Sequence, residues 1–231
     1  MGFPFFYTFG GSMLYRSIYS SPLGKVLILF IEESLLGLYF EGQKEFNDLI
    51  KDEEVKNFEI KDKNLRCESL GHEKNFEIKD KNLSGESLGH DKNKVSGEKI
   101  CDDKILGDTK KWLDLYFSGE EPDFTPKLKL EGTEFRRDVW KILLEIPYGE
   151  TLSYKDIANK LMASGKYERM SFQAVGGAVG HNPISIIIPC HRVVGTSGSL
   201  TGYAGGLARK VKLLELEGID VNKFFMPKNH K

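Results

Sequence analysis

The sequence predicts a mixed α/β protein built from two domains, and three observations support this prediction. β-Rich stretches separated by turn residues fill the start of the chain. Residues 133–180 instead carry apolar side chains at helical spacing, ahead of an apolar run, Ile184–Ile188, that is typical of a buried strand. A Pro-bounded stretch, Pro122–Pro126, is typical of a linker. We therefore expect one domain over residues 1–124 and a second over 125–231.

The first half predicts a small β meander followed by a short helix. Strands are expected at Tyr15–Tyr19, Lys25–Ile31 and Leu35–Phe40, because β-branched and aromatic residues there are interrupted by turn signals. The first turn, SPLG, combines proline and glycine, and the second is the polar stretch EES. The helix is expected near Glu45–Ile50.

A longer helix is expected over Thr109–Phe117, late in the first half. Thr109 can cap its N-terminus, because a threonine hydroxyl accepts a hydrogen bond from a free backbone N–H of the first turn. Ser118 and Gly119 are expected to end it. The apolar side chains recur at helical spacing and predict one buried face, made by Trp112, Leu113, Leu115 and Tyr116.

Residues 51–107 are expected to form a polar insertion that contains a duplication. The segment KNFEIKDKNLRCESLGH at 56–72 recurs as KNFEIKDKNLSGESLGH at 74–90. Two copies are too few and too polar to build a repeat fold, so a solvated insertion is the favoured interpretation. The alternative is a metal site, but its ligand spacing is unlike a compact zinc motif, and we expect no metal. Its ligands would be Cys67, His72, His90 and Cys101.

The second half predicts three short helices joined by turns. The first covers Thr133–Ile146, Ser153 can cap the second at Tyr154–Met162, and the third is expected over roughly Ser171–Gly180. From residue 125 onward there are 16 Lys and Arg against 10 Asp and Glu, whereas residues 1–124 have 17 against 24. Short helices in a basic half predict a helix-turn-helix, a common DNA-binding arrangement.

The third expected helix, SFQAVGGAVG, is rich in small residues. Each glycine in a helix interior costs about 1 kcal/mol relative to alanine, so such a helix needs a compensating contact. Tight packing against another helix would explain the glycines. A surface that fits a narrow groove of DNA would explain them equally, and both interpretations stay open on the sequence.

The segment after Ile184–Ile188 is the candidate for chemistry. Core packing does not require Pro189, Cys190, His191 and Arg192 in succession, and reactive groups are commonly displayed where a buried strand ends. A free cysteine has a pKa of ~8.5 and is only a few per cent thiolate at neutral pH, so it needs a proton acceptor. The sequence therefore predicts a nucleophilic cysteine with histidine as its base.

Composition excludes several other classes of protein. Hydrophobic residues make up 40% and charged residues 29% of the chain, as in globular proteins, and no apolar run approaches the ~20 residues that span a bilayer. Three cysteines are an odd and low number for a disulfide framework. The aromatic start lacks the basic stretch and cleavage site of a secretory signal. We expect a cytoplasmic protein, nuclear if its source is eukaryotic, with no membrane partner.

Taken together, the motifs of the second half resemble the O6-alkylguanine-DNA alkyltransferases, which repair DNA in a single self-inactivating reaction. Between Phe135 and Gly218 lie YGETLSY, AVGGAVGHNP, IPCHRVVG, GYAGGLARK and LLELEG, in the family's order. The resemblance implies a ribonuclease H-like N-terminal domain and a winged-helix-like C-terminal domain. It implies irreversible transfer of a methyl or larger alkyl group, without a cofactor, from guanine O6 in double-stranded DNA that is bound through the minor groove. We expect a monomer, because a repair protein that reacts once needs no second subunit. Whether O4-alkylthymine is also repaired stays open.

The resemblance also assigns roles to individual residues. Cys190 accepts the alkyl group, His191 takes its proton through a water, and Glu217 orients the imidazole. Tyr154 helps to rotate the nucleotide out of the duplex and assists the leaving guanine, and Lys210 hydrogen-bonds Tyr154. Backbone carbonyls at Cys190 and Val193 read the guanine amino group. Further matching positions brace the active-site turn or line the pocket and the DNA surface: Asn182, Ala174, Gly177, Arg192, Val193, Tyr203 and Ala204.

Two departures from the family concern the DNA side. The arginine that fills the space left by the extruded base falls on Gln173, and Arg169, one turn earlier, is a candidate substitute. The connection from Tyr154 to Gln173 is also longer than the family's. We therefore expect alkyl transfer with weaker binding to duplex DNA.

Two other classes of protein stay open. A cysteine hydrolase or amidotransferase would share Cys190 and His191 but would turn over without DNA. A lesion sensor would bind alkylated DNA without transferring the group. Such sensors lack the cysteine, so Cys190 argues against this alternative.

Overall fold

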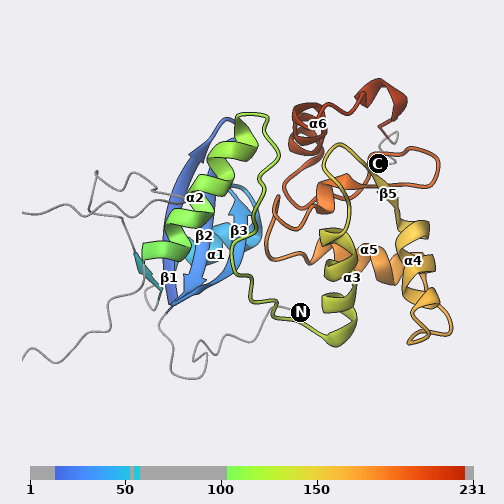
Figure 1. The fold of residues 1–231 in the computed structure, drawn as a ribbon, viewed down its shortest axis with the longest axis horizontal. Coiled ribbons are helices and arrows are strands. Elements are labelled where there is room, and N and C mark those ends of the chain that lie inside the picture. The colour runs from blue at the N-terminus through green and yellow to red at the C-terminus, as the bar shows by residue number, and fades with distance from the viewer. Residues whose placement is uncertain (1–13, 53–54, 58–102, 227–231) are drawn as a thin grey trace, which may run out of the picture. The chain divides into compact units, whose positions relative to one another are not determined.

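The computed structural model of the chain describes residues 14–52, 55–57 and 103–226 (Figure 1). These ranges form a mixed α/β fold, as predicted, and belong to one compact unit made of Met1–Glu59 and Cys101–Lys231. The expected domain boundary at residue 124 falls inside that unit and stays a prediction. The duplicated segment beyond Asn57 lies outside the described residues, as do the candidate metal ligands Cys67, His72, His90 and Cys101.

The first half contains the predicted β meander. Strands β1 (Leu14–Ser21), β2 (Gly24–Ile31) and β3 (Ser34–Phe40) pair antiparallel, and the short β4 (Lys56–Asn57) pairs parallel with β1, so that the sheet order is β3-β2-β1-β4. Gly24 in the first hairpin turn has a φ of 109°, a conformation that favours glycine, which agrees with the turn signal in the sequence.

Helices cover both faces of this sheet. Successive residues of a strand point to opposite faces, and β2 is buried on both sides. One side packs against α1 (Lys44–Lys51), in a core made by Leu14, Leu27, Leu29, Ile31, Leu36, Phe46, Leu49 and Val55. The other helix, α2 (Asp103–Phe117), contacts β1, β2 and β3 and runs along the sheet in Figure 1. The buried sheet thus holds α2 in place along its length.

The predicted start of α2 was wrong, because the helix begins at Asp103 rather than at Thr109. Thr109 is fully buried inside the helix, and its hydroxyl donates to the Ile105 carbonyl at 2.7 Å. A threonine can be accommodated in mid-helix when its hydroxyl bonds the carbonyl one turn earlier, so this residue type alone does not mark a helix start. The predicted end at Phe117 was correct.

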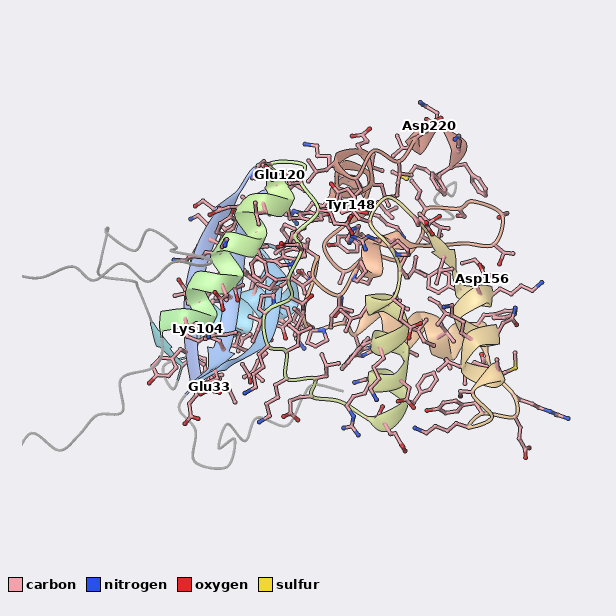
Figure 2. All side chains as sticks on the ribbon, in the orientation of Figure 1. Glu33, Lys104, Glu120, Tyr148, Asp156 and Asp220 are labelled. Atoms are coloured by element: carbon pink, nitrogen blue, oxygen red, sulfur yellow. The ribbon has the colours of Figure 1, made fainter. Side chains whose placement is uncertain are left out.

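Three short helices form the core of the second half, as predicted. They are α3 (Glu134–Leu144), α4 (Tyr154–Ala163) and α5 (Phe172–Gly180). Ser153 caps α4 in a capping box with Asp156, which is labelled in Figure 2. The Trp140 indole donates to the Ala178 carbonyl at 2.9 Å and ties α3 to α5. Among the helices of the described ranges, none combines the length and apolar character that a bilayer span requires.

The remaining elements surround the expected reactive segment. A short helix, η1 (Cys190–Arg192), leads into β6 (Val193–Val194), which pairs parallel with β5 (Leu152–Ser153). Helix α6 (Leu207–Leu216) contacts η1 and is followed by η2 (Val221–Lys223).

The prediction of a strand over Ile184–Ile188 is wrong, but the prediction that this segment is buried is confirmed. Each of its residues is buried, yet only Ile184 makes a bridge, to Leu38 on the edge of the sheet. The backbone then turns, because Ile188 N donates to the Ile184 carbonyl at 3.0 Å. Since a buried apolar run satisfies the core whatever its backbone shape, hydrophobicity alone could not distinguish this turn from a strand.

Candidate active site

The turn that presents Cys190 contains two unusual backbone conformations. Ile186 has a φ of 73°, a strained value for a β-branched residue, and Ile187 N donates to the Ser185 carbonyl across it at 2.9 Å. Pro189 then adopts φ −80° and ψ 61°, an inverse γ-turn in which Cys190 N donates to the Ile188 carbonyl at 2.8 Å. These successive tight turns end in η1, where Cys190 is the first residue.

Asn182 holds this turn from one side. Its Oδ1 accepts from Ile184 N at 3.0 Å, and its Nδ2 donates to the Ile188 carbonyl at 2.7 Å. The same Nδ2 lies 3.0 Å from Cys190 Sγ. The predicted brace of the active-site turn is thus in position, and it contacts the predicted nucleophile directly.

We expect Asn182→Ala to lower the free energy of unfolding by about 2–3 kcal/mol, because buried backbone groups of Ile184 and Ile188 would lose their partners. Urea unfolding measures this change. Asn159→Ala, an exposed asparagine on α4, is the matched control and should change stability by no more than about 0.5 kcal/mol. Equal losses in both variants would contradict the bracing role.

Cys190 and His191 are both buried, and burial affects their pKa values in opposite directions. Burial raises the pKa of the Cys190 thiol, although the hydrogen bond from Asn182 and the charge of Lys210 oppose the rise. Burial lowers the pKa of His191, although Glu217 opposes that fall. At neutral pH the pair is therefore a thiol beside a neutral imidazole, which can accept a proton.

Glu217 anchors the imidazole. Its Oε1 lies 2.6 Å from His191 Nε2, and its Oε2 accepts from Arg192 Nε at 2.8 Å and from Gly149 N at 3.3 Å. Burial would raise the pKa of this carboxyl, but the hydrogen bonds and charges of His191 and Arg192 outweigh burial and hold it at about 2. Glu217 is therefore ionised, and His191 Nε2 carries the proton that faces it.

This arrangement leaves the other nitrogen of His191 free to act. With the proton on Nε2, Nδ1 of the neutral ring carries a lone pair. Among the described residues, Nδ1 has no hydrogen-bond partner. The site thus combines a thiol, a neutral imidazole that can accept a proton and an ionised carboxylate that orients the imidazole, the kinds of group found in the triads of covalent catalysts.

Tyr116 also belongs to the site, although the sequence pattern identified it only as part of an apolar helix face. It lies in α2, is fully buried, and donates from its hydroxyl to Glu217 Oε1 at 2.6 Å. One property of the sequence could have pointed to Tyr116, because a phenol buried on an apolar face needs a hydrogen-bond partner. Which partner it would find depended on tertiary contacts that no local pattern encodes.

Lys210 and Tyr154 meet at a shared carbonyl. The Lys210 ammonium donates to the carbonyls of Val193 and Thr201, and the Tyr154 hydroxyl also donates to the Thr201 carbonyl, at 3.4 Å. The expected Lys210–Tyr154 hydrogen bond is thus replaced by a connection through Thr201. Burial lowers the pKa of Lys210 to about 8, and burial also raises the pKa of Tyr154.

The residues expected to line the pocket lie around the same centre. Tyr203 is buried, with its ring 6.4 Å from that of His191 and nearly perpendicular to it, and Ala204 beside it is exposed. Burial raises the pKa of Tyr203 well above its usual range. The Val193 carbonyl, expected to read a guanine amino group, already accepts from Lys210, which leaves one lone pair.

Arg192, expected at the DNA surface, instead points inward. Its guanidinium binds both carboxylate oxygens of Glu217, at 2.8 and 3.1 Å, and donates to the Ile146 carbonyl at 2.6 Å. Tyr148, labelled in Figure 2, lies under the guanidinium with its ring centre 5.6 Å away. This geometry favours support of the carboxylate over the expected contact with DNA.

The expected DNA-contacting residues are exposed, on α5 and in the loop before it. Gln173, Ala174 and Gly177 are exposed on the helix, and Arg169 is exposed ahead of it. A Cβ added at Gly177 would meet open space, whereas one at Gly176 would lie 3.8 Å from the Tyr154 ring. Tight packing against another helix therefore does not explain Gly177.

Together, the fold and the site define a mixed α/β protein whose described residues include a buried free cysteine next to a buried histidine–glutamate pair. Residues 134–219 match a family described as the DNA-binding domain of 6-O-methylguanine DNA methyltransferase. A methylated-DNA–protein-cysteine methyltransferase from Methanosarcina barkeri is 48% identical over 124 residues, which cover 54% of this chain and 75% of that protein. The chain belongs to the methylated-DNA–protein-cysteine methyltransferase family.

Other similarities agree with this assignment. The Mycobacterium bovis protein of the same name is 57% identical over 105 residues, which cover 46% of this chain. The matched region spans 61% of the length of that relative. A crystal structure of Mycobacterium tuberculosis OGT in complex with DNA is similar over 91% of this chain and 94% of that one, with a TM-score of 0.61 and 31% identity.

Proposed function

We propose that this protein repairs DNA by transferring an alkyl group from guanine O6 to its own Cys190. The observation that carries the proposal is the buried thiol beside a neutral imidazole, which an ionised Glu217 holds at 2.6 Å. The family assignment supplies the substrate class, since relatives are named for methylated DNA and a cysteine acceptor.

The reaction is a single displacement at carbon. The Cys190 proton moves to His191 Nδ1, with a water as relay, and the thiolate attacks the alkyl carbon. The new S–C bond forms as the C–O6 bond breaks, and the electron pair of that bond stays on the guanine, which takes up one proton. The imidazolium formed at His191 is stabilised by Glu217. Because water does not hydrolyse a thioether, each protein molecule reacts once.

Tyr154 is the proposed proton donor to the departing guanine. The Tyr154 ring lies 3.8 Å from where a Cβ at Gly176 of α5 would be, and its hydroxyl reaches the Thr201 carbonyl, so it lies between the proposed DNA-facing helix and the loop before Tyr203. Its raised pKa keeps the phenol protonated, as a donor to the leaving base must be. Extrusion of the nucleotide is needed because a buried thiol cannot reach a stacked base.

The test is the stoichiometry of guanine release from a duplex that contains O6-methylguanine. Repair predicts a plateau at one guanine restored per protein molecule. A hydrolase would instead turn over amides or esters continuously without DNA, and a sensor would bind the duplex with no methyl lost. Either of these results would contradict the proposal.

We propose that the exposed face of α5 lies against the minor groove, where Ala174 and Gly177 permit close approach of the sugar-phosphate backbone. Gln173 extends from this face without a charge. Duplex DNA is therefore expected to bind more weakly than it would with arginine at this position.

Gln173→Arg is expected to tighten binding to the alkylated duplex roughly tenfold, because an added guanidinium gains charge-assisted hydrogen bonds to DNA. Fluorescence anisotropy over a salt series measures the change. Asn47→Arg, which adds the same charge at an exposed position of α1, is the control and should leave affinity nearly unchanged. Unchanged affinity and transfer rate in the Gln173 variant would contradict the proposed role of this position.

We also propose a specific type of fold for each half of the chain. A ribonuclease H-like domain over residues 1–124 is supported by the antiparallel β1–β3 meander with α2 against it. A winged-helix-like, helix-turn-helix domain over 125–231 is supported by the packing of α3, α4 and α5 beside the β5–β6 pair. The monomeric state and the cytoplasmic location stay predictions from the sequence.

A further inference from the structure

Tyr116 links the first half of the chain to the reactive centre of the second. It lies near the C-terminal end of α2, the helix held against the sheet, and is fully buried. Its ring stacks on Trp112 at 5.2 Å and packs edge-on against Tyr148 and His191, with ring centres 6.1 and 6.3 Å away. These contacts fix the direction of the hydroxyl.

The hydroxyl shares one carboxylate oxygen with the proposed base. Tyr116 donates to Glu217 Oε1 at 2.6 Å, the same oxygen lies 2.6 Å from His191 Nε2, and the hydroxyl itself lies 3.3 Å from Nε2. The phenol has one hydroxyl hydrogen, and it is donated to Glu217, the nearer of the two possible partners. The hydroxyl and the carboxylate therefore both present lone pairs toward Nε2, which favours a proton on that nitrogen.

We propose that Tyr116 is a positioning residue, which holds Glu217 and His191 so that the imidazole keeps its proton on Nε2 and accepts the Cys190 proton at Nδ1. This inference rests on the proposed function, which it deepens by making the sheet domain part of the alkyl-acceptor machinery. Tyr116 touches neither the thiol nor the DNA in this role, and acts only through Glu217 and His191.

The pH dependence of transfer reports this role, because the groups around His191 and Glu217 set the pKa of His191, and Tyr116 is one of these groups. Burial and the charge of Glu217 raise the pKa of Tyr116 well above its usual range, so it stays a donor. Loss of its hydrogen bond would leave Glu217 a stronger acceptor, which favours the imidazolium form of His191. The other charged or titratable groups that face the pair are Cys190 and Arg192 from η1, Lys210 from α6, and Tyr148 and Tyr203 from loops.

The experiment compares Tyr116→Phe with Tyr19→Phe. The Tyr19 hydroxyl donates to Asp114 Oδ1 of α2 at 2.7 Å, so this control also removes a phenol–carboxylate bond that holds α2, but at a distance from Glu217. Both variants keep their rings. For the Tyr116 variant we expect about tenfold slower methyl transfer at saturating duplex near neutral pH, with the rising part of the pH–rate profile displaced to higher pH by about half a unit to one unit. DNA affinity should not change.

A second readout does not depend on DNA repair. Nitrogen NMR of His191 reports its tautomer and pKa directly, and the Tyr116 variant should raise that pKa, whereas the Tyr19 variant should match the wild type. An unchanged NMR titration and pH–rate profile in the Tyr116 variant would overturn the proposal, as would equal shifts in the control. If the wild type transfers no methyl group, the proposed function fails, and the NMR comparison still decides the role of Tyr116.

Discussion

Cys190→Ser is expected to abolish alkyl transfer while the protein still binds the alkylated duplex. A hydroxyl is far less acidic than a thiol and a much weaker nucleophile at neutral pH, so His191 cannot generate a competent anion from it. We expect the rate to fall by more than about 10³-fold. Single-turnover assays of guanine release measure the rate, and electrophoretic mobility or anisotropy measures binding.

The change leaves the surroundings of the site nearly intact. Serine is close in size to cysteine, and its oxygen can accept the Asn182 hydrogen bond that Cys190 Sγ now receives. Unfolding free energy should therefore change by less than about 2 kcal/mol. Cys190→Ala serves as a second variant that also lacks a nucleophile. Transfer that persists in both variants would show that another residue accepts the alkyl group.

Glu217→Gln is expected to cause the largest loss of stability, about 3–5 kcal/mol, together with slower transfer. The substitution removes the negative charge that neutralises buried Arg192, and a buried unpaired guanidinium is costly. It also replaces the anionic acceptor that fixes the His191 tautomer and stabilises the imidazolium with a neutral amide, so transfer should slow by about 10²–10⁴-fold. Urea unfolding and single-turnover kinetics measure the two effects. Glu215→Gln, an exposed carboxyl on the same helix, is the matched control.

The same carboxyl predicts how stability depends on pH. The folded-state pKa of Glu217 is lowered from 4.5 to about 2, so its contribution is fully present above pH 4.5 and is lost as the pH falls from there to about 2. A difference of this size corresponds to roughly 3 kcal/mol. Wild type should therefore lose about that much more stability than Glu217→Gln over this range. Parallel pH curves for the two proteins would contradict the assignment.

Elements with strong local signals were predictable from the sequence. β-Branched and aromatic stretches separated by turn residues predicted β1 to β3, and Ser153 marked the start of α4. The adjacent Cys190 and His191 were identified because core packing does not require that pair. Glu217 came from the family resemblance, and the structure places it 2.6 Å from His191.

The features that sequence reasoning missed depend on contacts between distant segments. Ile184–Ile188 was predicted as a strand because its burial was visible, but the turn is held by the side chain of Asn182 and by the strained Ile186. Tyr116 was placed on an apolar face, and its partner lies 101 positions further along the chain. Arg192 was assigned to the substrate or DNA surface through the family resemblance, while its partner Glu217 lies on another element.

Mass spectrometry of the wild-type protein after reaction with a duplex that contains O6-methylguanine tests the central claim most directly. The account predicts one adduct per protein molecule, heavier by a single CH₂ group, and peptide mapping that places it on Cys190. A protein of unchanged mass, or a methyl group on another residue, would contradict the claim that Cys190 is the alkyl acceptor.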